Sequence, residues 1–316
     1  MILFYVLSGY VLTRPYFQGR LFNYPVFLTK RVFRIYPAYW AALFSAVLFM
    51  AWLSRASLPG LSSYVNGVVW HDSSWSSFWH HLTILLIRIP EDSEMYNPVV
   101  WTLKYEVVFS LLCPVILFVS KRLDGKISCC LFFAASCLGN LFSGLRFMRY
   151  LFMFGIGVNL AKHAQDLKKA YSKFFLHAGW FLPASAFFLY TAQWWGFWPI
   201  VMPRWLILFH DVLITGGAVL FILLALYSKR LSAFLGSPPV YFLGKVSYSL
   251  FLFQFPVILT MIYAFYGKIP LGGILLLSLA LLLLVAALSY RWIELPALKK
   301  GNEISKRIYK QAPGAR

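Results

Sequence analysis

Apolar residues occur in long runs that short polar loops separate. Eight of these runs approach the ~20 residues that a membrane-crossing helix requires. They are 35–53, 99–119, 127–142, 145–161, 174–192, 206–227, 247–266 and 270–290. A further apolar run at 1–13 is too short to cross a bilayer, and its Ser8 and Gly9 are small residues at which helices pack closely. The pattern predicts an all-α, polytopic transmembrane helix bundle with eight full spans and one partial N-terminal span.

The composition indicates a membrane protein and argues against nucleic acid as a partner. Of the 316 residues, 60% are hydrophobic and only 12% are charged, against about 25% charged in soluble domains. The net charge of +19 would suit nucleic acid, but the cations lie in short loops between apolar runs, as membrane topology requires. We therefore expect the lipid bilayer as a partner and no nucleic acid. The four cysteines all lie in apolar runs, so neither a disulfide framework nor a metal site is expected.

Positive charge is unevenly shared between the two sides of the predicted bundle. If the loop at 14–34 is cytoplasmic and the spans alternate, 22 of the 29 lysines and arginines lie on the cytoplasmic side. This bias sets the orientation, because cytoplasmic loops are enriched in Lys and Arg. We expect a multi-pass protein of the cell inner (plasma) membrane with a cytoplasmic C-terminus. Its expected parts are an integral membrane domain at 1–300 and a basic cytoplasmic tail at 301–316.

The segment KRVFRIYPAYW at 30–40 places two arginines directly before an apolar run. Arg31 and Arg34 are three residues apart, so on a helix they share one face. Two arginines at a helix start can bind a phosphate bidentately, with Pro37 in the first turn of that helix. The alternative is a topological anchor, in which the cations stay in the cytoplasm and the following aromatic residues lie at the bilayer interface. These aromatic residues are Tyr36, Tyr39 and Trp40.

Two intramembrane positions carry ionisable groups. Glu106 lies about two turns into the run at 99–119, and Thr102 and Ser110 share its face at a spacing of four residues. A carboxylate at that depth is a functional candidate, because burying it without a partner is costly. The alternative is a structural glutamate paired with an arginine of a neighbouring helix. His210 and Asp211 form a second candidate, as a proton relay, although adjacent residues diverge on a helix.

The longest predicted outer segment, 54–98, mixes aromatic and acidic residues. Such a mixture suits a carbohydrate surface, by stacking and hydrogen bonding, or a stretch that lies at the headgroup level of the membrane. Its members are Trp70, Asp72, Trp75, Trp79, Glu91, Asp92, Glu94 and Tyr96.

The C-terminal third has two further polar features. Gln254 and Pro256 lie inside an apolar run, which predicts a kink and a hydrogen-bonding partner for the glutamine. Arg291 and Glu294 are three residues apart at the end of the last apolar run, which predicts a local ion pair on one helix face.

Six stretches together resemble the membrane-bound acyltransferase-3 family, which includes O-acetyltransferases of bacterial surface polysaccharides. They occur in the family's order and cover the chain from end to end. The stretches are FYVLSGYVLTRP (4–15), KRVFRIYPAYW (30–40), NPVVWTLKYEVVFSLLCPVI (97–116), LFMFGIGVNLA (151–161), LGKVSYSLFLFQFPVI (243–258) and LSYRWIELP (288–296). Motif positions without an assigned role are Ser8, Gly9, Ser247, Tyr248, Gln254, Arg291 and Glu294.

The resemblance implies an all-α bundle that moves an acyl group from cytoplasmic acyl-CoA to a hydroxyl, usually on a sugar. It implies that Arg31 and Arg34 lie on the CoA side. We predict that Trp101 and Glu106 belong to the catalytic set, with Glu106, from its depth in the membrane, orienting the base or the acceptor. The expected donor substrate is acyl-CoA, in the first place acetyl-CoA, with no permanently bound cofactor. The expected acceptor is a carbohydrate or a lipid-linked saccharide.

Two departures from the family pattern bear on activity. The family has one more helix before the Ser-Gly stretch, which carries an arginine and the histidine assigned as catalytic, and none of the six histidines here matches that position. The family also commonly has a histidine where this chain has Gln254. Either the start is misassigned, the helix was lost, or the protein is inactive as written. The rival interpretations are a transporter-like bundle and an inactive relative, and the arginine pair and the lack of internal repeats favour the transferase over the transporter.

Overall fold

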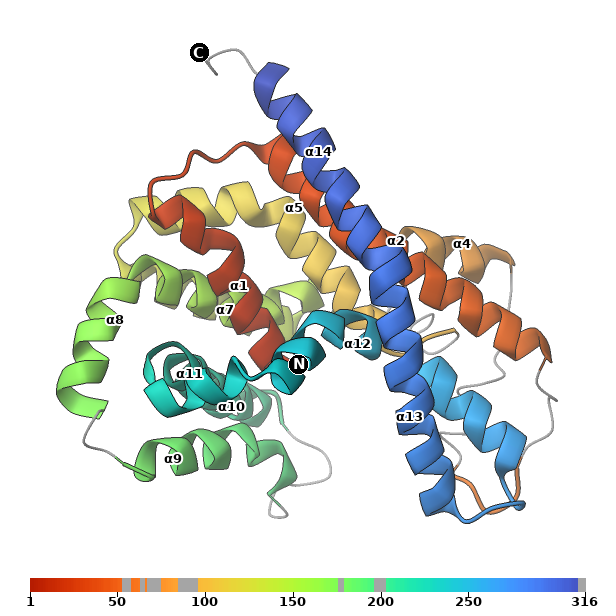
Figure 1. Ribbon diagram of the computed structural model, residues 1–316. Coiled ribbons are helices and arrows are strands. Elements are labelled where there is room, and N and C mark those ends of the chain that lie inside the picture. Colours follow the sequence, from red (N-terminus) through yellow and green to blue (C-terminus); the bar gives the residue numbers. More distant parts are fainter. Residues whose placement is uncertain are drawn as a thin grey trace. The chain divides into compact units, whose positions relative to one another are not determined.

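The computed structural model describes residues 1–52, 58–62, 66, 75–84, 96–175, 179–195 and 203–311. Within these ranges the regular structure is helical and no strand occurs, which confirms the predicted all-α class. The chain divides into two compact units (Figure 1). Unit 1 combines Met1–Phe22 with Leu111–Val240, and unit 2 combines Asn23–Ser110 with Tyr241–Arg316.

Unit 1 is built from one N-terminal helix and the middle of the chain. Its α-helices are α1 (Ile2–Phe17), the second half of α5 (Val100–Arg122), α6 (Gly125–Leu141), α7 (Arg146–Lys162), α8 (Ala164–Ala170), α9 (Phe181–Tyr190), α10 (Arg204–Tyr227) and α11 (Lys229–Leu235). Three short turns of other helix types join them. These are η1 (Ser143–Leu145), η2 (Tyr171–Phe175) and η4 (Ala192–Trp194).

Glycines let the helices of unit 1 touch backbone to backbone. A Cβ atom on Gly9 of α1 would overlap the Phe154 carbonyl of α7, and one on Gly157 of α7 would overlap the Val6 carbonyl of α1. Gly217 of α10 meets the Tyr190 backbone at the end of α9 in the same way. Helices approach this closely only where a small residue stands. The predicted close packing at Gly9 is confirmed.

Unit 2 joins the second helix of the chain to its C-terminal third. Its α-helices are α2 (Tyr24–Trp52), α4 (Trp75–Thr83), the first half of α5, α12 (Pro238–Phe265), α13 (Leu271–Ser289) and α14 (Leu295–Gln311). A π-helical turn, η5 (Tyr290–Glu294), links α13 to α14. The core of this unit is formed by apolar side chains of α2, α5 and α12, with Tyr39, Leu43, Val100, Leu103 and Leu252 all fully buried.

The helix α14 runs antiparallel to the first half of α2 (Figure 1). Gly301 of α14 faces the Phe33 side chain, whose Cβ lies 2.6 Å from where a Cβ on Gly301 would be. Further along, the Ser305 hydroxyl donates to the Val26 carbonyl at 3.4 Å. The predicted boundary at residue 300 falls inside α14, and the division into a membrane domain and a tail stays a prediction.

Five helices in the described part of the chain are long and apolar enough to cross a membrane. They are Tyr24–Phe49, Val100–Arg122, Trp205–Tyr227, Pro238–Phe265 and Leu271–Gln311. With the family identified below, they indicate a multi-pass membrane protein. The count of eight full spans is not confirmed, because three predicted spans form shorter helices of 17, 17 and 10 residues, α6, α7 and α9. The predicted partial span is α1, with 16 residues.

The start of α2 differs from the prediction. The helix begins at Tyr24 rather than near residue 35, and it continues for 29 residues. The Asn23 side chain caps it by accepting the Val26 N–H at 3.1 Å, and Pro25 lies in the first turn, where a missing N–H costs nothing. Pro37 therefore lies in the helix interior, where it removes the bond to the Phe33 carbonyl. The expectation that Pro37 opens the helix is wrong.

Candidate functional site

Arg31 of α2 is held by two residues of α5. Its Nη2 forms an ion pair with Glu106 Oε1, and its Nε donates to Ser110 Oγ at 3.0 Å. The Ser110 hydroxyl in turn donates to the Glu106 carbonyl at 2.8 Å. Thr102, Glu106 and Ser110 are all buried, so the predicted interior stripe is confirmed. Of the two interpretations of Glu106, the geometry gives it an arginine partner on a neighbouring helix.

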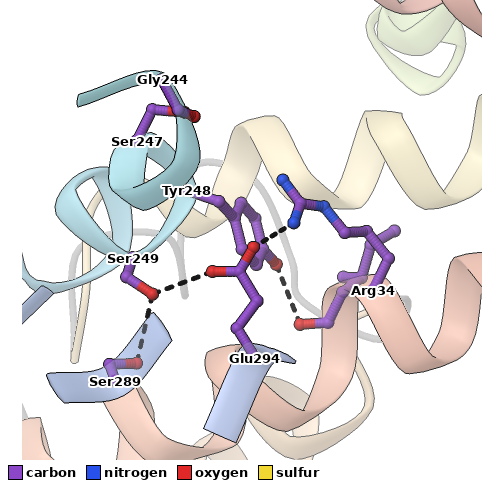
Figure 2. Close-up of polar contacts among 8 residues, drawn as sticks. Arg34, Gly244, Ser247, Tyr248, Ser249, Ser289 and Glu294 are labelled. Carbon is purple, nitrogen blue, oxygen red and sulfur yellow. Dashed lines mark hydrogen bonds and ion pairs between the residues drawn. The ribbon is translucent and has the colours of Figure 1, made fainter. Parts of the chain in front are cut away.

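Arg34, one turn further along α2, has a different carboxylate. Its Nη1 forms an ion pair with Glu294 Oε1 of η5 (Figure 2). The second carboxylate oxygen accepts the Ser249 hydroxyl of α12 at 3.0 Å, and the Ser289 hydroxyl lies 3.2 Å from Ser249 Oγ. The guanidinium also lies over the Tyr248 ring, 5.1 Å from its centroid. The Glu294 side chain is fully buried, whereas the Arg34 side chain is 35% exposed.

The predicted ion pair between Arg291 and Glu294 is wrong. Residues Tyr290–Glu294 form a π-helical turn, which has five residues in each hydrogen-bonded step and so departs from the α-helical spacing that the prediction assumed. Glu294 turns into the unit toward Arg34, and Arg291 stays exposed. The structure thus links two predicted motif positions that the sequence left separate, Arg34 and Glu294.

The aromatic residues after the arginines bind a helix end. Tyr36, Tyr39 and Trp40 donate to the carbonyls of Thr83, His81 and Leu82 at 3.0, 2.7 and 3.0 Å. These three carbonyls belong to the last turn of α4, whose C=O groups have no partner within the helix. The next residue, Ile84, is buried and has a φ of 60°, a strained conformation for a β-branched residue. The three rings thus act as a C-terminal cap, and Tyr39 is fully buried rather than at an interface.

The remaining motif positions lie around these networks, and Tyr248 joins one of them through its ring, over which the Arg34 guanidinium lies. The Tyr248 hydroxyl donates to the Ile35 carbonyl at 2.9 Å, and the Ser247 hydroxyl donates to Gly244 of its own helix at 2.9 Å (Figure 2). Gln254 is half-buried and makes no hydrogen bond within the described residues, so its expected partner is not found there. Trp101 packs edge-on to Tyr105, with ring centroids 6.1 Å apart.

Unit 1 contains its own ion pair. Arg149 of α7 donates from Nε and Nη2 to the two carboxylate oxygens of Asp211 of α10, at 2.7 and 3.0 Å. The neighbouring His210 Nδ1 is 4.0 Å from Asp211 Oδ1. Asp211 is therefore engaged by an arginine, and the proton-relay hypothesis for His210 stays a prediction.

Much of the predicted outer segment lies outside the described residues. This applies to Arg55, Trp70, Asp72, Arg88, Glu91, Asp92 and Glu94, and the Trp75 side chain is not described either. Of the two aromatic residues that are described, Trp79 is 49% exposed, while Tyr96 is buried against the ring of His81. Burial raises the pKa of the Tyr96 hydroxyl. Tyr96 thus belongs to the core of unit 2 and not to an exposed carbohydrate surface.

The order of these motifs along the chain matches a known family. The family model of the acyltransferase domain aligns with residues 1–291. The chain belongs to this acyltransferase family. Both arginine–carboxylate networks fall almost entirely within the matched range, with Glu294 three residues beyond it. The resemblance inferred from the sequence is confirmed.

Curated relatives match a shorter part of the chain. They include the O-acetyltransferase OatA of Staphylococcus aureus strains NCTC 8325 / PS 47, COL and MRSA252, each 40% identical over 87 residues. The match covers 27% of this chain and 14% of each relative. No solved structure matches the chain at a significant level.

Proposed function

We propose that the protein is a membrane O-acyltransferase that moves an acetyl group from cytoplasmic acetyl-CoA to a hydroxyl of a cell-surface or exported carbohydrate. The family match over residues 1–291 is the observation that supports this most strongly. The relatives named O-acetyltransferase support acetyl as the group and oxygen as the acceptor atom. In the reaction, the acceptor oxygen attacks the thioester carbonyl, a base takes the hydroxyl proton, and CoA leaves as the thiolate.

The two arginines of the motif have different parts in this proposal. Arg31 is 13% exposed and already donates from Nε and Nη2, so its role is to fix α2 against α5. Arg34 is 35% exposed and uses Nη1 for Glu294, which leaves further N–H groups of its guanidinium for a ligand. A guanidinium with two free N–H groups is suited to the phosphates of CoA. Arg34 is therefore the proposed donor-binding residue.

Glu106 remains the proposed orienting residue of the catalytic set. Its described partner is Arg31, so it acts by holding the helix segment that carries Arg34, one turn away. Trp101 lies on the same helix, half-buried and edge-on to Tyr105, and stays a proposed member of that set.

The test is ester formation by the full-length protein in membranes supplied with radiolabelled acetyl-CoA. We expect base-labile label in the carbohydrate fraction, and at least a tenfold loss with Arg34→Ala, equivalent to about 1.4 kcal/mol of barrier. The matched control is Arg149→Ala, which removes an arginine from the ion pair of unit 1 and should leave transfer per folded molecule unchanged. No labelled ester in any acceptor fraction would contradict the proposed reaction.

A second outcome separates the two interpretations of the arginine pair. If the double variant Arg31→Ala with Arg34→Ala inserts normally and transfers acetyl at the original rate, the arginines serve as topological anchors only. If insertion fails while the few inserted molecules still transfer acetyl, the anchor interpretation is again the correct one.

A further inference from the structure

Glu294 is bound on both carboxylate oxygens by side chains of other helices. Oε1 pairs with Arg34 of α2, and Oε2 accepts the Ser249 hydroxyl of α12 at 3.0 Å (Figure 2). Ser289, at the end of α13, lies 3.2 Å from Ser249 and completes the chain of polar groups. Two helices of unit 2 thus bind this carboxylate directly and a third contacts it through Ser249, and all of its described contacts lie within that unit.

Burying this carboxylate has a cost that packing alone does not explain. Removing a charged group from water is unfavourable, and replacing a buried ion pair by apolar residues is often neutral or stabilising. The chain also forms a π-helical turn at Tyr290–Glu294, and such turns occur frequently at functional sites. Both features indicate that the orientation of the Glu294 carboxylate has a function.

Two contacts hold the guanidinium of Arg34, the partner of Glu294. The Tyr248 ring supports one face of the guanidinium, and Glu294 binds one edge of it. A long arginine side chain has high rotamer entropy, so a guanidinium without such contacts would sample many directions. These two contacts restrict the orientation of the guanidinium, and the side chain is still 35% exposed.

We propose that Glu294, itself held by Ser249, is a positioning residue that sets the direction in which Arg34 presents its free N–H groups to the phosphates of the acyl donor. This inference rests on the proposed function, in which Arg34 binds that donor. It assigns roles to Glu294 and Ser249 that the motif alone does not give.

The most informative variant is Ser249→Ala in the full-length protein, because it changes no charge and does not touch Arg34. It removes one bond to Glu294, so the carboxylate loses its fixed direction. We expect the KM for acetyl-CoA to rise about fivefold to tenfold while kcat changes less than twofold, since a bond of this kind contributes about 1–1.4 kcal/mol. The matched control is Ser278→Ala in α13, a buried serine whose hydroxyl bonds only to Ile274 of its own helix. It should leave KM unchanged.

A second variant keeps the proposal testable if Ser249→Ala does not fold. Glu294→Asp retains the negative charge but withdraws the carboxylate by one methylene, so a positioning role predicts a raised KM for acetyl-CoA. A role in charge balance alone predicts an unchanged KM. An unchanged KM in Glu294→Asp would therefore overturn the proposal.

A double-mutant cycle distinguishes failure of this inference from failure of the proposed function. The dissociation constant for acetyl-CoA is measured by calorimetry on nanodisc-embedded protein with Ser249→Ala, Arg34→Ala and both. If Ser249 acts through Arg34, its substitution has no further effect once Arg34 is alanine. Equal effects of Ser249→Ala in both backgrounds would overturn the positioning role. If Arg34→Ala alone leaves the dissociation constant unchanged, the proposed function of Arg34 has failed and the positioning role with it.

Discussion

The two units hold their helices together by different means. In unit 1 the helices touch through their backbones, and Gly9, Gly157 and Gly217 each stand where a Cβ would overlap main-chain atoms of another helix. In unit 2 no described glycine meets the backbone of another helix, and side chains bridge the helices. The clearest bridges are Arg31–Glu106 and Arg34–Glu294. Unit 1 has a side-chain bridge as well, Arg149–Asp211, in addition to its backbone contacts.

The two kinds of helix contact have different consequences for ligand binding. A contact between two helix backbones requires glycine, because any larger side chain would overlap the neighbouring main chain. Such a contact presents no polar side chain to a ligand. A contact between charged side chains depends on particular atoms and leaves unused N–H groups, as at Arg34. Substitutions in unit 1 should therefore change the amount of folded protein, and those in unit 2 should also change what each folded molecule does.

The largest effect is expected from a bulky residue at the closest backbone contact. Gly157→Leu places four carbon atoms where the Val6 carbonyl and the Tyr10 N–H already lie. Overpacking usually costs about 1–3 kcal/mol where side chains can adjust, and here the obstacle is backbone, so we expect folded protein to be lost. Fluorescence-detected size-exclusion chromatography measures this. Gly272→Leu, at a position with no atom within 4 Å, is the control and should fold.

The second effect combines stability and function. Glu106→Gln leaves Arg31 buried without a counter-charge, and breaking a buried pair costs about 3 kcal/mol or more. We expect a lower melting temperature in detergent and at least a tenfold loss of acetyl transfer per folded molecule, about 1.4 kcal/mol of barrier. The counterpart in unit 1 is Asp211→Asn, whose partner Arg149 is 29% exposed. It should destabilise less and leave transfer per folded molecule intact; equal losses of transfer in both variants would remove the distinction between the units.

A smaller effect is expected at the cap of α4. Tyr39→Phe deletes the buried hydroxyl that donates to the His81 carbonyl at 2.7 Å, so that this carbonyl keeps only the Ile84 N–H, at 3.1 Å, among its described donors. The expected cost is about 1–2 kcal/mol of stability. The control is Tyr227→Phe in unit 1, whose hydroxyl donates to the Ala164 carbonyl at 2.8 Å from a less buried position. Thermal melts that rank Tyr227→Phe as the more damaging change would refute the importance of the α4 cap.

The smallest effect concerns the start of α6 in unit 1. Asp124 caps this helix, and the hydrogen bond from the Lys126 N–H holds the pKa of its carboxyl below the usual value. A lowered pKa means that the cap stabilises the fold above the ordinary aspartate pKa and that this contribution is lost as the pH falls through the folded-state pKa. The protection factors of the first α6 amides, which are corrected for the intrinsic pH dependence of exchange, should therefore fall on acidification in the original protein. In Asp124→Asn the protection factors of the same amides should stay constant over this pH range.

Patterns local to one helix predicted the structure well. The stripe of Thr102, Glu106 and Ser110 follows from helix periodicity alone, and so does the close packing at Gly9. The start of α2 was also readable, since Asn23 followed by Pro25 is a helix-start signal that the apolar run at 35–53 obscured.

Features that depend on partners far apart in the sequence could not be read in this way. Nothing in the spacing of Arg291 and Glu294 reveals a π-helical turn, so the pairing of Glu294 with Arg34, 260 residues away, was missed. The aromatic cap of α4 was missed for the same reason, because the acceptors are backbone atoms that any sequence possesses. The span count is not confirmed in 127–192, where apolar residues form short helices that hydropathy alone does not separate from membrane spans.

The most direct test of the central claim is the affinity of the nanodisc-embedded, full-length protein for acetyl-CoA when one arginine of each unit is replaced. The account predicts that Arg34→Ala weakens binding at least about tenfold, as expected for charge-assisted bonds to phosphate. It predicts that Arg149→Ala, which also breaks an arginine–carboxylate pair, leaves the affinity of the folded protein unchanged. Unchanged binding with Arg34→Ala, or equal losses in both variants, would contradict the assignment of the donor site to unit 2.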